Sequence, residues 1–157
     1  MTHRRALLLL PAALLLARCS PPPKPPAVLN LTMIGSAGQN ADPSGTAAPL
    51  AIKVYQLSST AKFTSSDWTA LTENEAATLG QDEAAPSQQF VVAPGQTQAQ
   101  TINLKPGVTS VGIIALYRDI DHAQWRATAS VADSGPTDLT LNIAALAITL
   151  APTAKKS

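Results

Sequence analysis

Residues 108–117 read VTSVGIIALY, and this stretch is apolar on both faces of an extended strand. Successive side chains of a strand point to opposite sides, so a strand with one wet face shows strict alternation. Here one face carries Val111, Ile113 and Ala115, and the other carries Ile114 and Leu116. We therefore predict a central strand that is covered on both sides.

The segments around this strand alternate between apolar and polar residues, which predicts half-buried strands. They are residues 27–34, 50–57, 89–93, 97–104, 124–131, 139–143 and 146–150. Turn signals separate several of them, at Pro94-Gly95, Pro106-Gly107 and Gly135-Pro136. About eight short strands favour a mainly β fold, a two-sheet β-sandwich in which each sheet covers the other.

Residues 58–80 differ from the rest and predict a short helical insert after the second strand. Asp67 is a candidate N-cap, Trp68 and Leu71 lie three residues apart, and Gly80 is a candidate C-cap. Aromatic residues make up only 4% of the chain, so we expect them to be core anchors. They are Tyr55, Phe63, Trp68, Phe90, Tyr117 and Trp125.

The N-terminus has the pattern of a secretory signal peptide, which we assign to residues 1–18. Residues 1–5 are basic and the twelve residues 6–17 are almost wholly apolar, a run too short for the roughly 20 residues that span a bilayer. The single cysteine, Cys19, excludes an internal disulfide and stands where a bacterial lipoprotein is lipidated. The segment resembles a bacterial lipobox, in which a small residue normally precedes the modified cysteine, and Arg18 departs from that pattern. The alternative is cleavage after Cys19 by ordinary signal peptidase.

Residues 19–26 then form a lipidated cysteine and a proline-rich tether, because SPPPKPP favours an extended polyproline conformation. The sandwich domain is predicted over residues 27–152, with a disordered tail over 153–157. Without the leader arginines the chain has eight basic and ten acidic residues, a balance that argues against nucleic-acid binding.

The sequence offers little material for catalysis, and we expect no cofactor, metal or small-molecule substrate. Asp119, Asp121 and His122 are best read as a solvated turn, although a metal site or a hydrolase centre there is an alternative. Four acidic residues around the insert are predicted to form a solvated face: Glu73, Glu75, Asp82 and Glu83.

The fifteen-residue loop 35–49 is the best candidate for a recognition surface, because long loops between strands are uncommon and are often functional or disordered. Its candidate partner-binding residues are Gly38, Asn40, Asp42, Pro43, Ser44 and Gly45. We expect that deleting residues 37–46 abolishes partner binding and leaves the fold intact.

The order of these motifs resembles the outer-membrane lipoprotein of type VI secretion systems, the TssJ or SciN family. The matching motifs are Cys19; Asn40, Pro43 and Gly45; the V-Y-Q-L strand at 54–57; Phe63, Asp67-Trp68 and Leu71; Pro94-Gly95; Tyr117-Arg118-Asp119; and Trp125-Arg126. Their order and spacing carry the resemblance, since no single motif is specific.

The resemblance implies a transthyretin-like sandwich that is lipid-anchored at the periplasmic face of the outer membrane. It also implies a non-enzymatic partner role, in which the loop between the first two strands binds the periplasmic part of the inner-membrane TssM (IcmF-like) protein. The alternative is a generic periplasmic lipoprotein that carries a small apolar ligand between its sheets.

Overall fold

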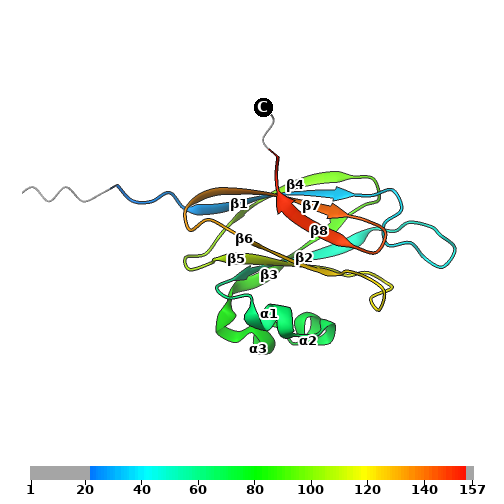
Figure 1. Ribbon diagram of the computed structural model, residues 1–157, viewed down its shortest axis with the longest axis horizontal. Coiled ribbons are helices and arrows are strands. Elements are labelled where there is room, and N and C mark those ends of the chain that lie inside the picture. The colour runs from blue at the N-terminus through cyan, green and yellow to red at the C-terminus, as the bar shows by residue number, and fades with distance from the viewer. Residues whose placement is uncertain (1–21, 155–157) are drawn as a thin grey trace, which may run out of the picture.

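The computed structural model describes residues 22–154, which form two four-stranded sheets packed face to face (Figure 1). The first sheet has the order β4-β1-β7-β8 and the second β3-β2-β5-β6. The first contains β1 (Ala27–Gly35), β4 (Thr97–Asn103), β7 (Gly135–Ile143) and β8 (Ile148–Pro152). The second contains β2 (Leu50–Leu57), β3 (Glu83–Val92), β5 (Ser110–Ala115) and β6 (Arg126–Ser130). The predicted two-sheet sandwich is confirmed.

Strand β5 is covered on both sides, as its sequence predicts, although it is shorter than the predicted stretch. Val111, Ile113 and Ala115 belong to the core between the sheets, whereas Ile114 packs in a second core beneath the helices. Gly112 faces the insert, where an added Cβ would lie 2.6 Å from Cζ of Phe63. The strand therefore joins the two cores.

The helical insert follows β2 and covers the outer face of the second sheet (Figure 1). It comprises α1 (Ala61–Ser65), α2 (Trp68–Glu73), α3 (Glu75–Leu79) and the 3₁₀ turn η1 (Gly80–Asp82). Asp67 caps α2 by accepting from the Ala70 amide at 2.8 Å, and Gly80 ends α3 with a φ of 55°, as predicted.

Two side chains of the second sheet fasten this insert. The Tyr55 hydroxyl donates to the Leu71 carbonyl at 3.0 Å. The Arg126 guanidinium donates to the carbonyls of Phe63 and Ser66 at 2.9 and 2.7 Å and stacks on Trp125. Of the six predicted anchors, Tyr55, Phe63 and Tyr117 are buried, whereas Phe90, Trp68 and Trp125 are only partly buried around the cores.

Strand β3 begins six residues earlier than predicted, at Glu83. Residues 83–88 are polar and include Pro86, which lacks an amide proton and so does not indicate a strand. The proline is tolerated because β3 is the edge strand of its sheet. At the other end of the chain, Thr153, which we assign to the tail, still donates its amide to the Asp138 carbonyl at 2.9 Å.

The two ends of the sandwich differ in what they carry. β1 runs from the tether (residues 22–26) towards the loop 36–49, so these two segments lie at opposite ends (Figure 1). We name these the tether end and the loop end. Within residues 22–154 no helix has the length and apolar character needed to cross a membrane. The leader and Cys19 lie outside the described residues.

Candidate partner-binding surface

The strand directions gather four connections at the loop end. β1 pairs parallel with β7, and the other pairings are antiparallel, so β1, β3, β5 and β7 all end there. The connections are residues 36–49, 93–96, 116–125 and 144–147. A long loop in this position can therefore be supported from three sides.

Hydrogen bonds tie these four connections into one body. Ser36 donates its amide to the Ile143 carbonyl at 2.9 Å, and the Gly95 amide donates to the Ser36 carbonyl at 3.1 Å. The Tyr117 hydroxyl contacts the carbonyls of Ala144 and Ala147 at 3.0 and 2.9 Å. These bonds therefore hold the loop end against both sheets in one arrangement.

Two polar residues are buried at the base of the loop 36–49. Gln39 has no exposed surface, and its side-chain amide donates to the Val92 carbonyl at 2.7 Å. Asn40 is 5% exposed and adopts a positive φ of 49°, a conformation that asparagine tolerates better than most residues. Gln39 Oε1 has no hydrogen-bond partner among the described residues, but the bonds of the Gln39 amide and of Asn40 favour one conformation of the loop.

Asn40 joins three connections through its backbone and side chain. Its amide donates to the Ala145 carbonyl at 3.1 Å, and its side-chain Nδ2 donates to the Pro49 carbonyl at 3.0 Å. Its Oδ1 accepts the Arg118 amide at 2.9 Å. Asn40 is one of the predicted partner-binding residues, and the structure places it beneath the loop surface, where it bonds the neighbouring connections.

The tip of the loop is closed by Asp42. Its Oδ1 accepts the amides of Ser44 and Thr46, each at 2.9 Å, and the Ser44 hydroxyl at 2.6 Å. These bonds, first that of the Ser44 hydroxyl and then that of the Thr46 amide, lower the pKa of Asp42. Gly45 has a φ of 86°, which a glycine adopts without strain.

The predicted partner-binding residues therefore fall into two groups. Gly38, Pro43, Ser44 and Gly45 are exposed and Asp42 is partly exposed, so they can meet a partner. Asn40 lies below them. The hydrogen bonds of Asp42 hold the loop tip, which therefore presents the exposed residues in a fixed arrangement.

A second loop, residues 116–125, lies beside this tip. Arg118 and Asp119 line a hollow of about 480 Å³ together with Ala41, Asp42 and Pro43. Asp119 contacts His122 Nδ1 at 2.7 Å, and this hydrogen bond raises the pKa of the histidine. Among residues 22–154 no group of three His, Cys, Asp or Glu side chains is placed to hold a metal.

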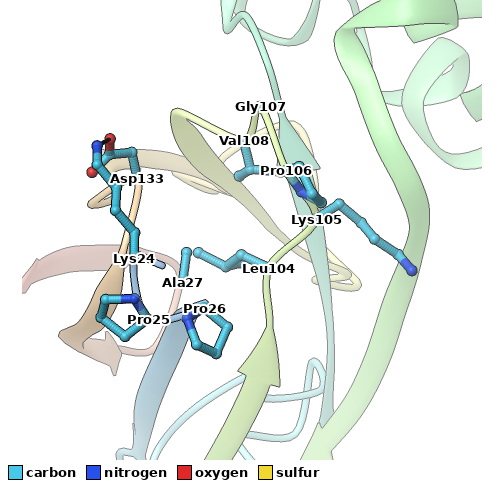
Figure 2. A pocket seen from close by; sticks show the side chains of 10 residues that line it. All are labelled: Lys24, Pro25, Pro26, Ala27, Leu104, Lys105, Pro106, Gly107, Val108 and Asp133. Carbon is cyan, nitrogen blue, oxygen red and sulfur yellow. Dashed lines mark hydrogen bonds and ion pairs between the residues drawn. The ribbon is translucent and has the colours of Figure 1, made fainter. Parts of the chain in front are cut away.

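Figure 2 shows the tether end, where residues of the tether and of the turn 104–108 line a hollow beside Asp133. The Lys24 ammonium pairs with the Asp133 carboxylate at 2.9 Å, yet these side chains are 75% and 77% exposed. The Gly135 amide donates to the Pro26 carbonyl at 3.2 Å, and the Leu104 amide donates to the Ala27 carbonyl at 3.0 Å. A hollow of about 240 Å³ lies between the tether prolines and the turn at 104–108.

The predicted solvated acidic face is wrong for Glu75 and Glu83. Glu75 pairs with Lys53 at 2.5 Å with side-chain exposures of 18% and 15%, and it accepts the Ser87 amide at 2.9 Å. Burial, and then the neighbouring Glu75, raise the pKa of Glu83 to about 8. Burial opposes ionisation of Glu75, but hydrogen bonds from Glu83, Lys53 and Ser87 outweigh it and lower the pKa of Glu75 to about 2.

A scan against protein-family models gives a match to the type VI secretion lipoproteins, described as VasD, EvfM and TssJ, over residues 27–146. This covers more than three quarters of the chain. The chain belongs to this TssJ family. The TssJ family is a lipoprotein component of the secretion apparatus, so the chain is not an enzyme.

Solved structures of TssJ-type lipoproteins have the same fold. TssJ1 from Pseudomonas aeruginosa is 29% identical, with a TM-score of 0.79 over 84% of this chain and 100% of that one. Serratia marcescens Lip, a membrane-bound component of the type VI secretion system, is 22% identical, with a TM-score of 0.70 over 83% and 99%.

A structure described as the C-terminal domain (869-1107) of the type VI secretion protein TssM from EAEC also matches. Its identity is 22% and its TM-score 0.67, over 81% of this chain and 99% of that one. A search of curated protein sequences gives no match.

Proposed function

We propose that this lipoprotein is anchored by a lipidated Cys19 at the periplasmic face of the outer membrane, and that its loop end binds the periplasmic part of the inner-membrane TssM-type protein. The observation that carries this proposal is the position of the tether and the loop 36–49 at opposite ends of the sandwich (Figure 1). A chain held at one end by lipid presents the other end to the periplasm.

The tether supports this orientation. Cys19 is eight residues before Ala27, where β1 begins, so at about 3.1 Å per residue for a polyproline segment the body stays within roughly 25 Å of its anchor. Two or more acyl chains hold a protein firmly to a bilayer, whereas one chain is marginal. Mass spectrometry of the mature N-terminus tests this step: we expect an acylated Cys19, and an unmodified start at Ser20 would contradict it.

The rigid loop end supports binding to a protein. Ordering flexible loops on association reduces affinity, and a surface already fixed by Asn40, Gln39 and Tyr117 avoids that cost. The space between the sheets is filled by buried aliphatic side chains such as Leu31, Ile52 and Ile113. This packing gives no support to the alternative of an apolar ligand between the sheets.

The structure described as the TssM C-terminal domain (869-1107) from EAEC contains a chain with this sandwich fold. Membership of the TssJ family and this shared fold support a place for the chain in the same secretion apparatus as TssM.

The test requires a change that blocks the surface without disturbing the fold. Deletion of residues 37–46 is unsuitable, because it would also remove the buried Gln39 and Asn40. Gly38→Arg and Pro43→Arg are better choices: both residues are exposed, and a Cβ added at Gly38 meets no atom within 4 Å.

We expect each variant to weaken binding of the TssM periplasmic part at least tenfold in calorimetry, with an unchanged thermal midpoint. The matched control is Pro106→Arg at the tether end, another exposed proline in a turn, which should bind like the unaltered chain. Equal affinity for all four proteins would reject the loop end as the binding surface.

A further inference from the structure

The side chain of Arg118 stands apart from the other charged groups at the loop end. Its backbone amide is fixed by Asn40 Oδ1 at 2.9 Å, while its side chain is exposed beside the hollow that Ala41, Asp42 and Pro43 line. Within residues 22–154 no hydrogen bond or salt bridge of its guanidinium is found. Arg126, by contrast, uses its guanidinium on Phe63 and Ser66.

The two carboxylates of the hollow are already engaged by their own loops. Asp42 Oδ1 accepts three hydrogen bonds within residues 42–46, and Asp119 Oδ1 contacts His122. Their Oδ2 atoms remain as acceptors, whereas the guanidinium has five N–H donors in a planar fork, so Arg118 supplies the unused side-chain donors of the hollow.

We propose that Arg118 is the anchoring residue of the partner interface, and that the hollow between the two loops receives main-chain carbonyl groups of the TssM-type protein. This inference rests on the proposed function and extends it from the loop 36–49 to the loop 116–125. Arginine is enriched among residues that dominate protein interfaces, particularly where neighbouring side chains exclude water.

The charges of the hollow decide which acceptor fits. Asp42 and Asp119 line the hollow together with Arg118. The bond of the Ser44 hydroxyl, and to a smaller extent the charge of Arg118, lower the pKa of Asp42. A carboxylate from the partner would meet both acidic groups and be repelled. Uncharged carbonyl oxygens, as in a turn or at a helix C-terminus, accept from the fork without that repulsion.

Asn40 explains how Arg118 is held in place. It bonds the Arg118 amide on one side and the Pro49 carbonyl on the other, so the spacing between the two loops is set from beneath. The surface is therefore composite, and neither loop provides it alone.

The experiment compares Arg118→Ala and Arg118→Lys with the unaltered full-length chain, expressed with its leader and purified in detergent. Binding to the periplasmic part of the TssM-type protein is measured by calorimetry. We expect Arg118→Ala to weaken binding about 30-fold or more, the range of a dominant interface residue. Arg118→Lys should recover little of this, because lysine lacks the planar fork.

Lys105→Ala is the matched control, since it removes an exposed cation at the tether end. It should leave the affinity unchanged, and all variants should unfold at the same temperature. If Arg118→Ala binds like the unaltered chain while Pro43→Arg does not bind, the inference is overturned and the proposed function stands. If the unaltered chain does not bind, both are overturned.

The salt dependence of the affinity distinguishes a carbonyl acceptor on the partner from a carboxylate acceptor. For carbonyl groups, raising the ionic strength from 50 to 500 mM should change the affinity less than threefold, because no ion pair is screened. A loss of tenfold or more that disappears in Arg118→Ala would identify a carboxylate and contradict the assigned acceptor.

Discussion

The loop end and the tether end close the same two sheets in different ways. At the loop end, buried Gln39 and Asn40 bond to strands and loops that are distant in sequence. At the tether end, Lys24 and Asp133 form an ion pair that is largely in solvent, and such pairs contribute little to stability. The sandwich itself is held at both ends, because buried Gln56 accepts the Lys105 amide at 2.8 Å beside the tether. The comparison indicates that the tether, residues 22–26, is the weakly attached part, and that the loop 36–49 is held as firmly as the sandwich.

A pair of glycines gives the largest expected contrast between the ends. At Gly35 an added Cβ would lie 2.5 Å from Gln39 Oε1 and 2.8 Å from the Ala93 carbonyl oxygen. At Gly107 an added Cβ meets nothing within 4 Å, so the only cost of alanine there is the strain of a φ of 86°. We expect Gly35→Ala to lower the free energy of unfolding by about 3 kcal/mol and Gly107→Ala by about 1 kcal/mol.

Urea denaturation of both variants measures this contrast. The slope of the unfolding free energy with urea concentration should be unchanged in both, which confirms that they unfold the same structure. Equal destabilisation by the two alanines would show that the loop end is no more tightly packed than the tether end.

Asn40→Ala should give the next largest effect, a loss of about 2 kcal/mol. The change leaves the Arg118 amide and the Pro49 carbonyl without their partner and puts alanine at a φ of 49°. Asn40→Gly isolates the side chain, because glycine accepts that φ at no cost. If Asn40→Ala and the unaltered chain have the same urea midpoint, Asn40 does not hold the two loops together.

The partly buried acidic pair Glu75 and Glu83 lies beside the insert and should make stability depend on pH. Because the pKa of Glu83 is raised to about 8 in the folded chain, its stabilising contribution is present below about pH 4.5 and is lost as pH rises towards 8. Glu75 acts in the opposite direction, since its pKa is lowered to about 2 and its contribution is lost as pH falls towards that value.

Glu83→Gln keeps the size of the side chain and removes its titration. Between pH 5 and pH 9 the unaltered chain should lose on the order of 1 kcal/mol relative to this variant, after allowance for solvent screening. Urea midpoints of both proteins at pH 5, 7 and 9 provide the comparison. Parallel curves would mean that the carboxyl group of Glu83 titrates normally.

Lys24→Ala should have the smallest effect, with no measurable loss of stability, because its ion pair with Asp133 is exposed. Thermal unfolding at 50 mM and 500 mM salt should show nearly the same midpoint for this variant and the unaltered chain. A loss comparable to that of Asn40→Ala would remove the difference between the two ends.

Sequence periodicity predicted the sandwich well. Strand 27–35 buries alternate residues along most of its length, and strand 110–115 buries nearly all of its residues, so both patterns can be read from the sequence. It also predicted the Asp67 cap and the Gly80 stop, which are local effects. The buried Gln39 and Asn40 were not predictable, since polar residues in a glycine-rich loop normally face solvent.

The acidic pair and Arg118 were missed for the same physical reason. Glu75 and Glu83 meet only because α3 packs over β3, and Arg118 meets the loop tip only because two sheet connections end side by side. Such contacts depend on tertiary packing and have no signal in local spacing. The exposed residues Gly38 and Pro43 remain predicted contacts.

Hydrogen exchange of the full-length chain, with and without the periplasmic part of the TssM-type protein, tests the central claim most directly. The account predicts new protection of backbone amides in residues 36–49 and 116–125, with none in residues 104–109 and 131–134 at the tether end. Protection confined to the tether end, with the loop end exchanging as in the free chain, would contradict it.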